Sequence, residues 1–417
     1  MKKLFTLVVT LISCITFLGF GNNAFANEQS SDAEEISYKQ EAQRELFDKL
    51  ARPLTMTLTQ TQMDIHDFGD LFFDKNEELH FKYKESVVPT SKILQQLLVN
   101  LRANGIEVEA GTYTHKDLLK QQDEIYQEIV DYYGGEENLP TISLVSDIFE
   151  EKVKFSYNSL EEALLIKLSS EYGDILEFEQ KEFEKKELNK SQTGNWTNLG
   201  AGIAIDNSNC SVAGIAAKSG NYFLITASHC FSGTVASDGT GRLVTQNSYY
   251  VGRQHAQAMG INLDFALVKI MDNGLSGGRY ATNGIRVATD TSTAEVFDNT
   301  LTAADSTSPA FSQVVCRAGI ITAKQCGRVI QKGAMLGGWP DNKTRKVSVV
   351  APDNPSGFST GGDSGGPVYR PNTTGNILTG VLVGTSASNG FFTDIMDGLN
   401  YYSASLYTSN SIVKVVN

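Results

Sequence analysis

The spacing of apolar residues changes near residue 190 of this 417-residue chain. In the first half, apolar residues recur every three or four positions, as Ala42, Leu46 and Leu50 do, which indicates one face of a helix. Shorter apolar runs separated by polar turns indicate strands. The first half is therefore expected to be α+β, with helices over 37–51, 92–102, 115–133 and 160–171, a hairpin over 68–83 and a strand over 174–178.

The second half has a different pattern. From residue 194 onward, short apolar runs alternate with Gly, Ser, Thr and Asn about every ten positions. Only the segment 396–406 suggests a helix. This pattern predicts an all-β domain, either a sandwich or a barrel, with strands that include 202–205, 222–225, 265–270, 346–350 and 377–383.

Residues 1–26 have the pattern of a secretion signal. Two lysines precede an almost wholly apolar run over 4–20, and Ala24-Phe25-Ala26 supplies small residues around a cleavage point. The segment ending at Cys14 also resembles a lipid-attachment site, but the apolar run continues past it, so a lipoprotein signal ranks second and a retained anchor third. The other apolar stretches are too short to span a bilayer. We expect a secreted, extracellular protein.

Charge and cysteine content divide the chain at the same place. Residues 27–193 carry 35 Asp and Glu against 18 Lys and Arg, a net charge of −17, whereas residues 194–417 carry 13 against 15, a net charge of +2. Neither half has the dense basic patch of a nucleic-acid-binding protein. An acidic, lysine-rich run over 177–190 is expected to form a solvated helix, followed by an exposed joint over 191–199. We therefore predict a signal peptide over 1–26, an acidic α+β unit over 27–193 and a separate domain over 194–417.

A glycine-rich motif, Gly361-Gly362-Asp363-Ser364-Gly365-Gly366-Pro367, lies in the second half. Glycine is favoured where the backbone turns sharply or approaches another atom closely, so this motif predicts a tight loop. Such a loop would expose the Ser364 hydroxyl beside free backbone N–H groups, as a nucleophile next to an oxyanion hole requires. Alone, the motif also fits an ordinary turn.

Two upstream motifs supply a base and an acid. His229 ends a strand-like run, and Asp264 opens the apolar strand that follows it. A carboxylate entering a buried strand is costly unless it is hydrogen-bonded, and an imidazole N–H is its natural partner. Asp238 is the alternative acid, and His255, the other histidine of this half, is expected in a loop. The order His, Asp, Ser is that of trypsin-like β-barrel proteases rather than of subtilisins or α/β-hydrolases.

Together, segments 226–230, 264–267 and 362–367 resemble the chymotrypsin-fold serine peptidases. More narrowly, the chain resembles the secreted bacterial branch typified by α-lytic protease and the streptogrisins, covering 200–417 well and 64–190 loosely. The resemblance implies an all-β, trypsin-like double β-barrel catalytic domain preceded by an α+β propeptide, which in the family assists folding and inhibits the enzyme. It implies a protein made as a zymogen.

The resemblance also assigns roles to individual residues. Ser364 would attack the scissile carbonyl, His229 would accept and return its proton, and Asp264 would orient the imidazole. The N–H groups of Gly362 and Ser364 would bind the oxyanion.

Other residues would support this site. Arg317 would pair with Asp363 in the role that a freed N-terminus has in the animal enzymes, and loss of either partner would leave a costly unpaired charge. Four cysteines in an exported domain allow three pairings, of which the resemblance favours Cys210–Cys230 and Cys316–Cys326.

The substrate pocket is expected between 357–361 and 385–389, with Phe358, Thr360, Ser386 and Ser388 as wall residues. The disulfide that usually braces this pocket in the family is absent. Neither run contains an acidic residue, which disfavours cleavage after Lys or Arg, and neither contains His or Arg, which disfavours cleavage after Glu. A small or apolar residue before the cut is therefore favoured.

We expect no metal and no cofactor. The expected partners are protein or peptide substrates and the chain's own propeptide, with no nucleic acid and no stable membrane anchor, and the enzyme is expected to be a monomer. The rival interpretation is a catalytically silent, protease-like binding protein or adhesin, although such proteins usually lack one member of the triad. Alternatively, the N-terminal half stays attached and recruits substrates.

Overall fold

The structure is a computed structural model of the chain. It describes residues 21–60, 65–135, 138–140, 142–180, 196–206, 210–231, 235, 241–246, 249–260, 263–271, 278–287, 297–322, 324–337, 339, 343–353, 357–386 and 389–416. The predicted signal peptide lies mostly outside these residues, because the description begins at Gly21. No helix in the described ranges is both long and apolar enough to cross a membrane.

The N-terminal half contains two small α/β units. In the first, a three-stranded sheet packs its apolar side chains against two helices, and Phe47 and Phe81 lie in that core. In the second, three strands at the end of a larger sheet pack against two further helices around Phe155. The first unit comprises α1 (Gly21–Gln60), β1 (Gly69–Phe73), β2 (Leu79–Lys84), α2 (Lys92–Ala103) and β3 (Glu107–Gly111). The second comprises α3 (His115–Tyr133), β4 (Ile142–Asp147), β5 (Lys152–Tyr157), α4 (Glu162–Tyr172) and β6 (Leu176–Gln180).

The local sequence explains α3 well. Thr114 and Asp117 form a capping box at its start, and Gly134 ends it in the left-handed conformation, with φ of 72°. The prediction of a solvated helix from residue 177 is wrong for 177–180, which belong to strand β6. The pairing of Phe155 with Phe178 across β5 and β6 explains the difference, because sheet pairing outweighs the local charge pattern.

The C-terminal half is a double β-barrel, as the resemblance implied. Its first barrel is a six-stranded sheet in the order β12-β13-β14-β11-β10-β23, wrapped around a buried aliphatic core. Its strands are β10 (Gly214–Lys218), β11 (Asn221–Thr226), β12 (Leu243–Gln246), β13 (Tyr249–Met259), β14 (Asp264–Ile270) and β23 (Ser405–Leu406). The short strands β7 (Asn198–Ala201), β8 (Ala204–Ile205) and β9 (Cys210–Ser211) precede them.

The second barrel closes on itself, because strand pairs run β17-β18-β19-β22-β21-β20 and back to β17. These strands are β17 (Val314–Arg317), β18 (Gln325–Leu336), β19 (Arg345–Pro352), β20 (Pro367–Arg370), β21 (Asn376–Ser386) and β22 (Asn389–Asp394), flanked by β15 (Tyr280–Ile285), β16 (Asn299–Ala304) and β24 (Val413–Lys414). The predicted helix over 396–406 is shorter in the structure, where α5 spans Ile395–Tyr401 and Ser405 already belongs to a strand.

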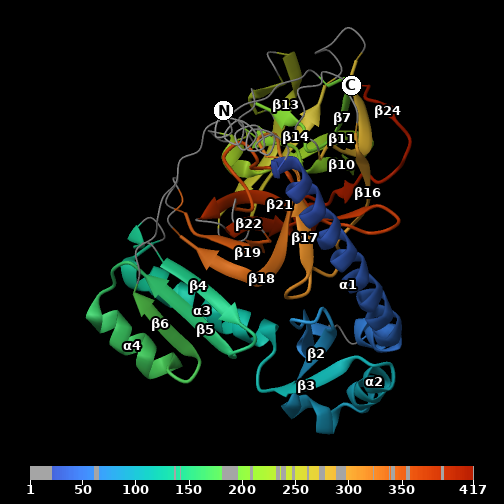
Figure 1. The fold of residues 1–417 in the computed structure, drawn as a ribbon. Helices are drawn as coiled ribbons and strands as arrows, with labels where there is room; N and C mark the ends of the chain where they lie inside the picture. The colour runs from blue at the N-terminus through green and yellow to red at the C-terminus, as the bar shows by residue number, and fades with distance from the viewer. Residues whose placement is uncertain are drawn as a thin grey trace, which may run out of the picture.

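The N-terminal half is joined to the second barrel by a strand pair. Strand β4 continues the sheet beyond β18, with Leu144 opposite Met335 and Ser143 opposite Leu336. Figure 1 shows the green β4–β6 sheet beside the orange β18 and β19, and the blue α1 alongside β17. The N-terminal half thus extends the barrel by backbone hydrogen bonds.

Candidate active site

The adjacent strands β11 and β14 bring the base and the acid together. His229 lies in the 3-10 turn Ser228–Cys230, just after β11, and Asp264 is the first residue of β14, which pairs with β11. Asp264 Oδ1 accepts a hydrogen bond from the backbone N–H of His229 at 2.9 Å, and Oδ2 lies 2.8 Å from His229 Nδ1. Asp264 is fully buried, whereas the His229 side chain is 28% exposed. The carboxylate therefore fixes the ring from the protein side and leaves part of it accessible.

The charge of Asp264 is stabilised in spite of its burial. Desolvation by burial would raise the pKa of this carboxyl, but the charge and hydrogen bonds of His229 and the charge of Arg345 outweigh it and lower the pKa to about 2. The acid is therefore ionised at neutral pH, as an imidazole-orienting group must be.

Ser364 lies on a tight loop that is docked against the end of β11. Gly365 has φ of 81°, and a Cβ atom there would come within 2.1 Å of Thr226 Oγ1 and 2.4 Å of the Ser211 carbonyl oxygen. Ser211 holds the loop from below, since its N–H donates to the Ser364 carbonyl at 2.7 Å and its hydroxyl donates to the Gly362 carbonyl at 3.0 Å. Glycine is required at residue 365 because no larger residue fits this contact.

The structure brings the serine loop to the histidine segment without a direct bond between the two side chains. Ser364 is half-buried, and within the described residues its hydroxyl forms no hydrogen bond with His229. Such contacts are often long in unliganded enzymes and tighten when substrate binds. In the same ranges, the N–H groups of Gly362 and Ser364 have no hydrogen-bond acceptor, so they are free to bind an anionic oxygen.

A buried ion pair supports the loop from the other side. Arg317 Nη1 lies 3.2 Å from Asp363 Oδ2, and both side chains are fully buried. Asp363 also accepts hydrogen bonds from the backbone N–H groups of Thr360 at 3.1 Å and Ile321 at 2.9 Å. These bonds satisfy the buried carboxylate and fix the residue that precedes Ser364.

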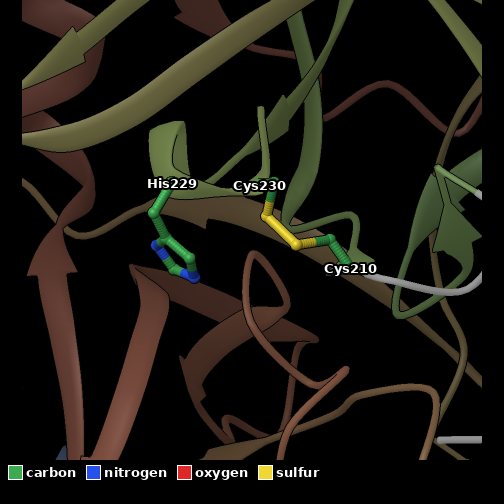
Figure 2. A group of neighbouring side chains, drawn as sticks. All are labelled: Cys210, His229 and Cys230. Carbon is green, nitrogen blue, oxygen red and sulfur yellow. A yellow bond between two sulfur atoms is a disulfide. The ribbon is translucent and has the colours of Figure 1, made fainter. Parts of the chain in front are cut away.

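The two disulfides have the pairing that the resemblance implied. Cys210–Cys230 connects the residue before Ser211 with the residue after His229, and Cys316–Cys326 connects β17 with β18. Figure 2 shows the first disulfide beside the His229 ring. Cys210, His229 and Cys230 lie close enough together to suggest a metal site. The two sulfurs are bonded to each other, however, and leave no thiolate for a metal ion.

The predicted pocket requires one correction. The side chain of Phe358 is fully buried and belongs to the core of the second barrel, so it is not accessible to a substrate. Its carbonyl oxygen instead accepts a hydrogen bond from Arg317 Nε. Thr360 is half-buried and Ser386 is exposed, while Ser388 lies outside the described residues. Ser359, in the first predicted run, donates from Oγ to the carbonyl of Gly384, the residue just before the second run, at 3.4 Å.

The alternative residues lie elsewhere. Asp238 is outside the described residues. His255 belongs to strand β13 rather than to a loop, and its ring lies 5.0 Å from that of Phe223.

Two supporting residues were not predicted. Ser211 has no motif around it, although its place next to Cys210 is a weak signal. Arg345, which contacts Asp264, has no sequence motif or neighbouring signal that could have identified it.

Comparison with solved structures returns bacterial chymotrypsin-like serine proteases, the proteins that the motifs resemble. They include Thermobifida fusca protease A (23% identity, TM-score 0.39), Nocardiopsis protease (21%, 0.40) and an α-lytic protease homologue, N4 (18%, 0.39). Each match covers 51% of this chain and 100% of the other. No protein-family model matches the chain, and no curated protein does. At these identities and scores, the activity must be inferred from the site itself.

Proposed function

We propose that residues 194–417 form a serine endopeptidase that hydrolyses peptide bonds through an acyl-enzyme. The observation that carries this proposal is the direct bonding of Asp264 to His229 at the end of the strand against which the Ser364 loop is docked. A base oriented by a buried acid, next to an accessible serine, is the arrangement that activates a hydroxyl nucleophile.

Each residue then has one task. His229 accepts the proton of Ser364 as the hydroxyl attacks the scissile carbonyl, and it later donates that proton to the leaving amine. Asp264 stabilises the imidazolium formed in between. The N–H groups of Gly362 and Ser364 donate hydrogen bonds to the oxyanion. Water then attacks the acyl-enzyme with the same help from His229, and the carboxylic acid product is released.

We further propose that the acidic N-terminal half is a propeptide, so that the chain is made as a zymogen and exported. Strand β4 pairs with β18, and α1 contributes buried polar contacts to the second barrel. The two disulfides suit an oxidising environment outside the cytoplasm. The mature enzyme would cut near residues 191–199 and act as a monomer on proteins or peptides, without a metal or cofactor, preferring a small or apolar residue before the cut.

A phosphonofluoridate probe tests the enzyme assignment. The processed protein is expected to be labelled at Ser364, as shown by peptide mapping, and to lose its peptidase activity in proportion. Ser364→Ala and heat-denatured wild type are the matched controls, and neither should react. A folded, processed protein without label at Ser364 would indicate the rival function, a silent binding protein.

Processing and specificity have separate tests. Sequencing the N-terminus of the secreted protein should give a residue near 191–199, whereas an intact N-terminal half would indicate a permanently attached domain.

Profiling on a peptide library should show cleavage after small or apolar residues, and dominant cleavage after Lys, Arg or Glu would refute this preference.

A further inference from the structure

Asp264 has a second charged partner, which comes from the other barrel. Arg345, the first residue of β19, donates a hydrogen bond from Nε to Asp264 Oδ2 at 2.7 Å. Arg345 is 2% exposed and Asp264 is fully buried. Oδ2 is also the oxygen that lies 2.8 Å from His229 Nδ1. One carboxylate oxygen is therefore shared between the imidazole and the guanidinium.

The guanidinium of Arg345 is held in place. Its Cζ lies 4.5 Å from the centre of the Trp339 ring, within the range of a cation–π interaction. The indole is itself fixed, because Trp339 Nε1 donates to the Leu336 carbonyl at 2.7 Å, and Leu336 is the residue paired with Arg345 across β18 and β19. The contact with Asp264 is thus part of the second barrel's architecture.

We propose that Arg345 is a positioning residue that sets the pH at which His229 becomes a free base. This inference rests on the proposed function, because it assumes that His229 is the general base. Within the described residues, the charged or titratable groups that contact Asp264 are His229, from the turn after β11, and Arg345, from β19. With Arg345 present, the group of three carries a charge of +1 when the imidazole is protonated and zero when it is neutral.

Removing Arg345 changes this balance. The protonated imidazole would then face an uncompensated carboxylate and would hold its proton to higher pH, because an unshared opposite charge favours the charged form. His229 would therefore act as a base only at higher pH. The carboxylate would also lose the donor that fixes its plane, so the ring would be oriented less well.

The pH dependence of kcat/KM on a peptide substrate tests the proposal. Arg345→Gln is expected to move the midpoint of the acid limb upward by about one pH unit, and Arg345→Lys, which keeps the charge, by less than half of that. Trp339→Leu, which loosens the guanidinium without removing it, should give a smaller shift in the same direction. A purely structural role would lower stability or kcat and leave the midpoint unchanged.

Arg370→Gln is the matched control. It removes another buried arginine of the second barrel. Arg370 pairs with Asp305 at 2.9 Å and with Glu41 of α1, and within the described residues it bonds to neither Asp264 nor His229. Its loss should destabilise the protein without moving the acid limb. An unmoved midpoint in Arg345→Gln, or an equal shift in Arg370→Gln, would overturn the inference. If Arg345→Gln does not fold, Trp339→Leu decides by the same criterion.

Two further outcomes keep the proposals distinct. If the variants fold but are not processed, the His229 signal can be titrated by NMR in the full chain carrying Ser364→Ala, with and without Arg345→Gln, and the same upward shift is expected. If the parent enzyme itself has no peptidase activity, the proposed function fails. If the parent is active and the midpoint does not move, only the role of Arg345 fails.

Discussion

The backbone N–H of Ser211 donates a hydrogen bond to the carbonyl oxygen of Ser364, with the two atoms 2.7 Å apart. Ser211 also accepts a hydrogen bond at its own carbonyl from Thr226 Oγ1, at 2.8 Å. The Ser364 loop of the second barrel is thereby joined through one residue to the strand that leads to His229 in the first. The relative position of Ser364 and His229, the proposed nucleophile and base, depends on this short connection.

Gly365→Ala should disrupt that connection. A methyl group at residue 365 would lie 2.1 Å from Thr226 Oγ1, at a φ of 81° that residues with a side chain rarely adopt. We expect a loss of stability of about 2 kcal/mol and at least a hundredfold lower kcat/KM, measured by urea unfolding and peptide hydrolysis. Gly220→Ala, which also has positive φ but meets no atom within 4 Å, is the control for strain alone. Equal effects of the two changes would contradict the steric explanation.

Arg317→Ala should abolish activity and lower the melting temperature. It leaves Asp363 buried and without its ion-pair partner, which typically costs about 3–5 kcal/mol. Urea unfolding of the protein measures the cost. Arg242→Ala is the control, because Arg242 pairs with Asp206 at a 37% exposed site, where the expected loss is at most about 1 kcal/mol. Full activity in Arg317→Ala would show that the pair does not support the serine loop.

The two disulfides should differ in their effect on activity. Replacing both cysteines of either pair by serine removes a cross-link worth about 3 kcal/mol on the chain-entropy estimate. Cys210–Cys230 flanks Ser211 and His229, so its loss should also reduce kcat, whereas the loss of Cys316–Cys326 should mainly reduce stability. Thermal unfolding measures the loss of stability. Kinetics at a temperature where both variants are folded measure the loss of kcat.

Arg44 should be important for maturation. It is buried in α1 and donates to Gln313 Oε1 at 2.8 Å and to the Ser308 carbonyl at 2.6 Å on the catalytic domain. Arg44→Ala leaves the Ser308 carbonyl without this donor, and Gln313 Oε1 keeps the N–H of Ala310. The change should weaken the contact by about 2 kcal/mol and lower the yield of active enzyme. Arg52→Ala, an exposed position on the same helix, is the control and should have a normal yield. Equal yields would argue against a folding role for this contact.

Stability should fall steeply in acid because of Asp264. Its pKa is lowered to about 2 in the folded protein, so its contribution is fully present above the unfolded value near 4 and is lost as the pH falls toward 2. The difference corresponds to about 2 kcal/mol. Urea unfolding between pH 2 and 6, in a Ser364→Ala background that prevents autolysis, should show this slope. The slope should be reduced in the same background carrying Asp264→Asn.

The sequence predicts those parts of the molecule that depend on local signals. The helix predicted over 115–133 is α3, with the same bounds, and the close pairing of His229 with Asp264 follows from two short motifs. Glycine spacing likewise indicates the tight loop at Ser364.

Contacts between distant segments could not be predicted in this way. Arg345 reaches Asp264 across 81 residues and carries no motif. Phe358 lies in the predicted loop, but sequence does not show the direction of its side chain, and it belongs to the core. The strand predicted over 174–178 is β6, but its continuation to Gln180 depends on a partner, β5, that local charge does not reveal.

The pairing of β4 with β18 has a consequence for the proposed processing. Removal of the N-terminal half would expose the backbone groups at Met335 and Leu336 that now face β4. An uncovered strand edge readily accepts another extended segment. In the full chain β4 covers this strand edge. If the N-terminal half is removed as proposed, the remaining domain would either leave the edge open or bind another extended segment there.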